Sequence, residues 1–226
     1  MGRLKLPQFP VAVYVRAIFL LVAVAFAVFF YLRSSHINEP TASQIQDYLS
    51  NNELQVSTEV VNDFQQIYFV FDGQRVSVTS GKANHTNPIA SGKYIVWTET
   101  PYQQNTSLMV LYDVLTKTKT QLTFTGTSLR PGMDGNKVVW EDWSSSQPQV
   151  YYYDGVTTQQ ISRGYPSVRP AIKDHQIAYA QELSINYWQT VVYNTQTKQQ
   201  EVLATGTQEA AGWPKFVDGQ FVADKP

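Results

Sequence analysis

The chain contains no cysteine among its 226 residues, and it has only three histidines. Without cysteine there can be no disulfide, no thiolate metal site and no cysteine nucleophile. His36, His85 and His175 are too far apart in the sequence to form a metal-binding pair. Charged residues make up only 15% of the chain, and a formal net charge of −1 gives no general attraction to nucleic acid. We therefore expect no metal, no cofactor and no nucleic-acid partner.

Hydrolase motifs are absent as well. The chain has no Gly-x-Ser-x-Gly nucleophile elbow, and the run Ser144-Ser145-Ser146 is typical of a flexible loop. Glu141 and Asp142 are neighbours in the sequence, whereas the two carboxyl groups of a glycosidase face each other from separate segments. We expect this acidic pair to solvate a loop or to meet an arginine. The sequence predicts no catalytic residue.

One long apolar run, residues 10–32, is interrupted only by Arg16. A helix of this length spans about 34 Å, which is enough for a hydrocarbon core of about 30 Å. Basic residues gather at its N-terminal end, so the positive-inside bias places residues 1–9 in the cytoplasm and the chain after Arg33 outside. We expect a single-pass anchor in the lipid bilayer of the cell membrane. The alternative is a cleaved signal peptide, for which Ala25-Phe26-Ala27 has the right form, but the apolar run continues past it.

The next segment, residues 33–64, is polar and contains one pattern of helical spacing, formed by Ile45, Tyr48 and Leu49. Thr41 or Ser43 is placed to cap a short helix there. We read this segment as a stalk that holds one short helix.

From residue 65 onward the chain repeats itself about every 40 residues. An aromatic residue followed by Asp or Asn ends a β-rich run four times, at Phe71, Tyr112, Tyr153 and Tyr193. Prolines keep a similar spacing, at Pro88, Pro131, Pro170 and Pro214. In the clearest unit, four short strands are expected at 130–133, 137–141, 149–153 and 158–162. Four antiparallel strands per repeat of this length are typical of a β-propeller blade.

The two ends of the repeat are incomplete. The first expected strands, 66–71 and 75–80, correspond to the third and fourth strands of a blade, and the last, 213–217 and 220–224, to the first and second. Joined in one composite blade, they would close the ring and leave no sheet edge exposed. We therefore expect an all-β domain over residues 65–226, a small propeller of four blades with four antiparallel strands each. The alternative is an open arc that a second chain completes.

The amino-acid pattern of the repeat resembles that of TolB-type propellers. The similar stretches are Pro131–Trp140 (PGMDGNKVVW), Tyr151–Asp154 (YYYD) and Gln159–Ser162 (QQIS), and the resemblance extends over about residues 66–226. It implies a propeller architecture. Such propellers include binding scaffolds and accessory domains of peptidases, so the resemblance implies no particular site residue.

Two kinds of loop emerge on the same face of a propeller: those between the second and third strands of a blade, and those between successive blades. Aromatic and arginine side chains, which dominate recognition surfaces, gather in these expected loops: Tyr102, Arg130, Trp143, Tyr165, Arg169 and Trp188. Arg130 and Arg169 each precede a proline of a first strand, so we expect both near the mouth of the central axis, where they would bind an acidic group. The alternative is that the aromatic rings pack between blades and the arginines pair with acids such as Glu141.

These features predict a membrane-anchored, extracytoplasmic propeller that acts as a non-catalytic binding or scaffolding module, with an envelope protein or a glycan as its partner. Two alternatives stay open. One is a carbohydrate-active enzyme that uses the acids of the loop face. The other is a subunit that completes a larger envelope assembly.

Overall fold

The computed structural model of the chain describes residues 39–224, and the compact domain begins at Pro40. The predicted transmembrane segment, residues 10–32, and the N-terminal residues 1–9 lie outside the described residues. Within the described range, none of the helices is long and apolar enough to cross a membrane.

A short helix, α2 (Ala42–Leu49), opens the domain, as the sequence predicted. Thr41 is its N-cap. The Thr41 side chain accepts a hydrogen bond from the backbone N–H of Gln44, and the Gln44 side chain accepts one in return from the backbone N–H of Thr41. This reciprocal capping box stabilises a helix that is too short to persist alone. Ile45 is buried in the first core cluster, so the helix is part of the folded domain.

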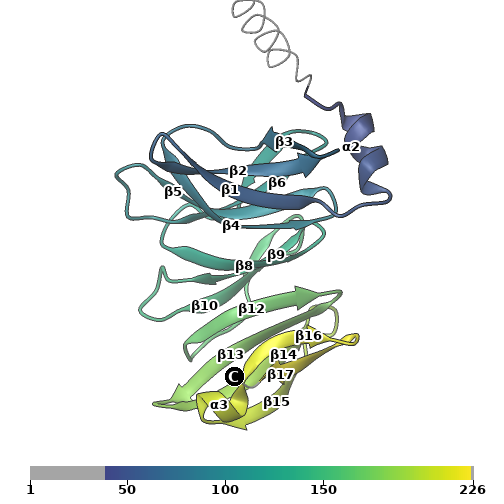
Figure 1. Cartoon of the computed structure of the whole chain (residues 1–226). Coiled ribbons are helices and arrows are strands. Elements are labelled where there is room, and N and C mark those ends of the chain that lie inside the picture. The colour runs from purple at the N-terminus through teal and green to yellow at the C-terminus, as the bar shows by residue number, and fades with distance from the viewer. Residues whose placement is uncertain (1–38, 225–226) are drawn as a thin grey trace, which may run out of the picture. The chain divides into compact units, whose positions relative to one another are not determined.

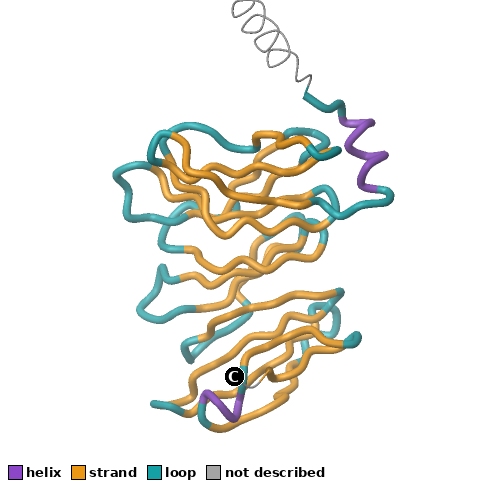
Figure 2. Tube along the Cα trace, in the orientation of Figure 1, coloured by secondary structure: helices purple, strands orange, loops and turns teal. Residues whose placement is uncertain are grey.

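The remainder of the domain is a series of antiparallel sheets that follow one another in chain order (Figures 1 and 2). The first sheet has three strands and the last has two, while the three sheets between them have four strands each. A four-residue helix, α3 (Gln208–Ala211), precedes the last sheet. The strands of the five sheets, in order, are β1 (Gln55–Val61), β2 (Phe64–Phe71) and β3 (Gln74–Ser77); β4 (Ala83–Ser91), β5 (Tyr94–Pro101), β6 (Leu108–Asp113) and β7 (Thr118–Gln121); β8 (Ser128–Asp134), β9 (Lys137–Asp142), β10 (Gln149–Tyr153) and β11 (Thr158–Gln160); β12 (Ser167–Lys173), β13 (Gln176–Ser184), β14 (Tyr187–Asn194) and β15 (Gln200–Gly206); and β16 (Trp213–Val217) and β17 (Gln220–Asp224).

The apolar core lies between successive sheets. Trp97, Trp140 and Tyr179 occupy equivalent positions on the second strands of the three complete sheets, and all three are fully buried. Each belongs to a cluster that combines residues of its own sheet with residues of the neighbouring sheet. Because second and third strands are covered on both faces, they are largely continuous apolar runs, as in β9. The all-β, antiparallel repeat predicted from the sequence is confirmed.

The predicted composite fourth blade is wrong. Residues 55–61, which fall within the predicted stalk, form β1 and pair with β2 along their whole length. The hairpin turns at Asn62 and Asp63, which have φ of 50° and 69°, the positive values that a two-residue hairpin turn needs. β1 therefore occupies the edge of β2 that the composite blade assigned to residues 220–224.

At the other end of the domain, the β16–β17 hairpin forms a sheet of its own and packs on the fourth sheet. Phe221 is buried and Phe216 is partly buried, and their ring centroids lie 5.2 Å apart. Ala178 and Val192 of the fourth sheet cover these rings, whereas the composite blade would have placed them beside the first sheet.

Candidate functional site

The loops at one end of the sheets carry most of the exposed apolar surface. We call this end, which comprises loops 102–107, 122–127, 143–148, 161–166, 185–186 and 207–212, the loop rim; it lies at the left-hand ends of the sheets in Figure 1. Of the eleven large apolar side chains that are exposed in the described residues, six lie on the loop rim or next to it: Tyr102, Phe124, Trp143, Tyr165, Ile185 and Tyr187. Exposed apolar side chains are a feature of interaction surfaces when they form one contiguous patch.

The same irregularity recurs in the first strand of each complete sheet. Asn87, Arg130 and Arg169 have φ of 52°, 49° and 54°, and each is followed by proline. The register of the strand pair shifts at each of these positions, which is the signature of a β-bulge. The bulge interrupts strand pairing and leaves each of the three side chains exposed. Two of the three are arginines, so the repeat itself presents cations at equivalent positions.

The Glu141 carboxylate accepts hydrogen bonds from Arg130, Trp143 and Arg169, and so connects these three residues. The Glu141 side chain has 0% exposure, while that of Arg130 is 54% exposed, and the Arg130 Nη1 atom donates to both Glu141 oxygens at 3.0 and 2.9 Å. Trp143 Nε1 donates to the same carboxylate at 3.2 Å, and the backbone N–H of Arg169 donates to it at 2.7 Å. Charge-assisted hydrogen bonds of this kind compensate the cost of burying the carboxylate.

Arg130 keeps unused donors. Because Nη1 makes both contacts with Glu141, the Nη2 and Nε hydrogens have no partner in the described part of the chain. An anionic group can therefore bind Arg130 without displacing Glu141.

The Arg169 side chain is held differently. Its guanidinium carbon lies 4.4 Å from the centroid of the Trp213 ring, which is a cation–π contact. Trp213 in turn meets Trp188 edge to face, with centroids 5.6 Å apart. The sequence suggested carboxylate partners for both arginines; the structure gives one to Arg130 and an indole to Arg169.

Neighbouring rim loops are tied together. The backbone N–H of Trp143 donates to the Thr127 carbonyl at 2.8 Å. Gly126 has a φ of +83°, and a Cβ at this position would lie 2.5 Å from the Ser144 Cβ, so only glycine allows the two loops to approach this closely. Trp143 is 46% exposed although its backbone and indole N–H are both held. A large aromatic ring is therefore displayed in a fixed position.

Of the six predicted site residues, the structure links four through contacts: Arg130, Trp143, Arg169 and Trp188. Tyr102 stacks edge to face on Phe64 of the first sheet, at 5.5 Å, and is a separate feature of the loop rim. Tyr165 is exposed, and its carbonyl accepts hydrogen bonds from Gln149 and Ser167. Whether any of the six binds a ligand stays a prediction.

A second polar element recurs between the first and second strands, toward the end away from the turn that joins them. Directly opposite cross-strand pairs are hydrogen-bonded in each complete sheet: His85–Glu99 at 3.2 Å, Ser128–Asp142 at 3.0 Å and Ser167–Gln181 at 3.1 Å. His85 Nδ1 also lies 3.0 Å from the Gln65 carbonyl. The hydrogen bond from His85, assisted by one from Trp97, lowers the pKa of Glu99 against the effect of its partial burial. Each pair lies within one sheet, so the three pairs do not form a shared site.

Sequence reasoning missed these pairs, although a signal was present. The first member always stands three residues before the strand proline, and the second always two residues after the buried aromatic residue. Trp213 was missed as the partner of Arg169 because it belongs to the next sheet.

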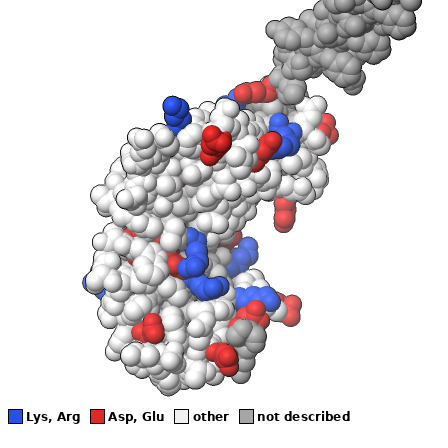
Figure 3. Space-filling model, turned by 60° about the vertical axis from the view of Figure 1, so that its left-hand side comes forward, with Lys and Arg blue, Asp and Glu red and all other residues white. Residues whose placement is uncertain are grey.

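Acidic and basic side chains are mixed on the surface of the domain. On the face drawn in Figure 3, several Lys and Arg side chains gather beside a hollow. No group of three or more His, Asp or Glu side chains within residues 39–224 is arranged to hold a metal ion.

No protein-family model matches the chain, and no curated protein matches it in sequence. Solved structures do match. TolB from Acinetobacter baumannii is 18% identical with a TM-score of 0.51 over 73% of this chain and 43% of that one. The β-propeller domain of the Trilobed protease from Pyrococcus furiosus, described as having an open velcro topology, is 15% identical with a TM-score of 0.52 over 65% and 48%.

A peptidase gives a similar result. Pyrococcus horikoshii acylaminoacyl peptidase is 12% identical, with a TM-score of 0.54 over 67% of this chain and 25% of that one. The chain thus spans less than half the length of each of these three proteins. At such identities the likeness concerns the fold alone. By its antiparallel blades and its structural neighbours, the described domain resembles a TolB-type β-propeller.

Proposed function

We propose that the chain is a non-catalytic binding module, which uses the loop rim around Arg130, Trp143 and Arg169 to hold an acidic segment of a partner protein. The observation that carries this proposal is the buried Glu141. It fixes an arginine and a tryptophan that both stay about half exposed, and it leaves further guanidinium donors free.

A fixed rim favours binding for two physical reasons. Side chains that are already immobilised lose little entropy when a partner arrives. Arginine and tryptophan are also the residues that contribute most to binding energy at interfaces. The exposed rings of the neighbouring loops would supply the apolar contact that surrounds such a centre. A protein partner fits this surface better than a glycan, because an extended apolar rim needs an apolar counterpart.

The test is capture of partners from solubilised membranes with the full-length chain as bait. Arg169→Ala removes the guanidinium but keeps the backbone N–H that Glu141 accepts, so the fold should not suffer. Arg75→Ala is the matched control, because Arg75 also lies over a ring, that of Tyr68 at 4.3 Å, but on an outer strand of the first sheet. We expect Arg169→Ala to reduce capture by about tenfold, the effect of about 1.4 kcal/mol, and Arg75→Ala to leave it unchanged.

Equal capture by both variants would remove the loop rim from consideration. Retention on polysaccharide beads, lost in the same variant, would identify a glycan instead of a protein as the partner.

We further propose that residues 10–32 anchor the module and that the propeller lies outside the cytoplasm. Support comes from the hydropathy and flanking charge of that segment. Tyr48 of α2 contacts Phe71 at 5.3 Å, at the end of β2 that faces away from the loop rim, so α2 leaves the rim free. Protease added to intact cells should then digest the propeller; protection until the membrane is opened would contradict this topology.

A second candidate is a subunit of a larger assembly. Two observations favour it: the terminal sheets have three and two strands instead of four, and the structural neighbours include a peptidase and the β-propeller domain of a protease. Light scattering of the complex purified in detergent distinguishes the candidates, because a constitutive subunit would not be recovered as a free monomer.

A further inference from the structure

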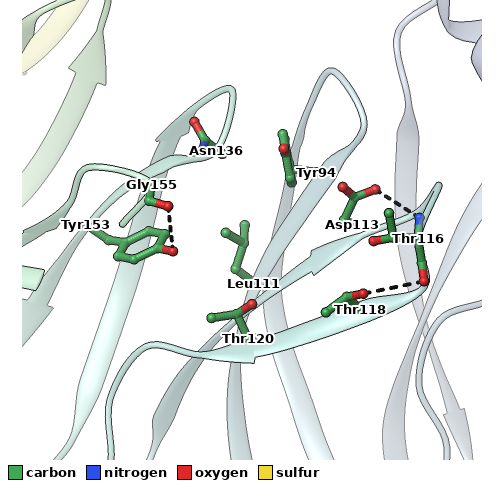
Figure 4. A pocket seen from close by; sticks show the side chains of 9 residues that line it. All are labelled: Tyr94, Leu111, Asp113, Thr116, Thr118, Thr120, Asn136, Tyr153 and Gly155. Carbon is green, nitrogen blue, oxygen red and sulfur yellow. Dashed lines mark hydrogen bonds between the residues drawn. The ribbon is translucent and has the colours of Figure 1, made fainter. Parts of the chain in front are cut away.

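A cavity of about 240 Å³ opens between the second and third sheets, at the end of the domain opposite the loop rim (Figure 4). It is smaller than the pockets of about 300–1,000 Å³ that hold drug-sized ligands. It can therefore accommodate a small molecule or one unit of a longer chain. No residue of the loop rim lines this cavity.

One side of the cavity is a row of hydroxyl groups. Thr118 and Thr120 lie two residues apart on β7, so their side chains share a face of the strand, and Thr116 precedes them in the turn. Asn136, in the turn between β8 and β9, adds an amide from the third sheet. Hydroxyl and amide groups both donate and accept hydrogen bonds, which suits a ligand that itself carries hydroxyl groups.

Tyrosine rings and an apolar floor complete the lining. Figure 4 shows Leu111 between Tyr153 and Tyr94, which come from different sheets. The Tyr153 hydroxyl donates to the Gly155 carbonyl at 2.9 Å, which fixes the orientation of this ring. Such a cavity offers ring surfaces for C–H groups and hydroxyls for polar edges.

The cavity presents no free charge. Its one acidic residue, Asp113, is paired with Lys93 at 2.7 Å. Asp113 also accepts hydrogen bonds from the backbone N–H groups of Leu115 and Thr116. Desolvation by partial burial raises the pKa of Asp113, but the hydrogen bonds from Lys93 and from these N–H groups outweigh it and hold that pKa below the usual value. A ligand therefore meets a neutralised carboxylate, which favours an uncharged molecule over a phosphate or a carboxylate.

We propose that this cavity binds one ring of a neutral carbohydrate. A pyranose ring has C–H groups on its faces and hydroxyl groups at its edge, which matches the two tyrosines and the row of threonines. The site lies at the opposite end of the domain from the loop rim, and it does not depend on the function proposed for that rim.

The experiment is saturation-transfer NMR on the full-length chain, in a detergent without a sugar headgroup. The probes are glucose and N-acetylglucosamine, with glucuronate as the charged counterpart. Because a single ring contributes few contacts, we expect a Kd on the order of 1 mM for the neutral sugars. Glucuronate should bind more weakly, because Lys93 is already paired with Asp113 and the lining offers the glucuronate charge no unpaired cation.

The double variant Thr118→Val/Thr120→Val keeps the shape of both side chains and removes their hydroxyl groups. We expect it to weaken neutral-sugar binding about fivefold or more, the loss of one or two hydrogen bonds. Thr205→Val is the matched control, an equally exposed threonine on β15 of the fourth sheet. Asn136→Ala is a second variant in case the first does not fold.

Binding that disappears with Thr118→Val/Thr120→Val or Asn136→Ala and persists with Thr205→Val supports the site. The proposal is overturned if no neutral sugar gives a signal at about ten times that Kd, or if the cavity variants bind as well as the control. Preferential binding of glucuronate would also overturn it, since the ligand would then be an anion.

Discussion

Glu141 shows how one residue can serve both stability and display. The carboxylate is buried without solvent contact, and its partners are Arg130, Trp143 and the backbone of Arg169. The last of these comes from the next sheet, so Glu141 also joins two blades. A buried carboxylate costs stability when it is alone and stabilises the fold only while its donors are present.

Replacing Glu141 therefore has a graded effect. Glu141→Ala removes the acceptor of the Arg169 backbone N–H, the Trp143 indole N–H and the Arg130 guanidinium, and it should lower the free energy of unfolding by about 3 kcal/mol. Glu141→Gln keeps an acceptor and should cost about half as much. Urea denaturation measures both, with Glu182→Ala, on a strand of the next sheet, as a control expected within about 0.5 kcal/mol of the natural chain. A loss below 1 kcal/mol for Glu141→Ala would show that Glu141 is not the centre of the site.

Glu99 gives the stability a dependence on pH. Its pKa in the folded domain is lowered from 4.5, first by the hydrogen bond from His85. The resulting stabilisation is therefore complete above the unfolded value and is lost as the pH falls through the lower, folded value. Between about pH 6 and pH 3 the natural chain should lose more stability than Glu99→Gln, which has no such carboxyl group. Parallel stability curves for the two proteins would contradict the pairing.

At the scale of elements, the bulge in the first strand of each complete sheet is the repeated device that presents side chains. Its central residue is left-handed, a conformation that glycine and asparagine tolerate and that β-branched residues avoid. Two of the three bulges nevertheless carry arginine. Backbone strain retained at equivalent positions is typical of functional surfaces.

The positive φ of Asn87 in its bulge predicts how substitutions there change stability. Asn87→Val should destabilise the domain by about 1–2 kcal/mol, because a β-branched residue is forced to positive φ. Asn87→Gly should change stability by only a few tenths of a kcal/mol. Thr86→Val, one residue earlier in the same strand, is the control, since valine suits ordinary strand backbone. Thermal melting of the three variants checks the order; equal effects of Asn87→Val and Thr86→Val would argue against a conformational cause.

In the domain as a whole, the first and last sheets do not join to close a ring, so each sheet is stabilised mainly by its immediate neighbours. Each core cluster joins a sheet to its neighbour, and the first and last sheets share no cluster within the described residues. Linear arrays of this kind respond to damage mainly at the site of damage and at the adjacent unit.

Phe221→Ala tests this locality. Loss of a buried phenylalanine costs about 3–5 kcal/mol, which should release the β16–β17 hairpin. Hydrogen exchange should then accelerate in that hairpin and on the fourth sheet, where Ala178 and Val192 are uncovered. Exchange in β1–β3 should not change. Faster exchange in β1–β3 would instead indicate that the hairpin closes a ring with the first sheet.

Much of this architecture follows from local sequence. The repeat of aromatic, proline and turn residues fixes the period of the sheets, because each landmark has a local backbone role. The bounds of β16 and β17 agree with those expected, and a short helix forms where helical spacing was recognised, with Thr41, one of the two expected caps, at its start. Turn and capping residues act on their immediate neighbours, so these features are local. Alternation of strand direction alone also places Arg130, Arg169 and Trp143 at one end of the sheets.

Other features depend on contacts between distant residues. The sequence of β1, QVSTEVV, does not alternate between apolar and polar residues, and six of its seven residues are exposed in the structure. Nothing in this sequence therefore predicted that it would pair with the edge of β2. Glu141 binds Arg130, which lies 11 positions away at a bulge, and the backbone N–H of Arg169, which lies 28 positions away in the next sheet. Local propensity and periodicity carry no information about such pairs. Only the stacking of one sheet on the next decided which edges stay open and which charges meet.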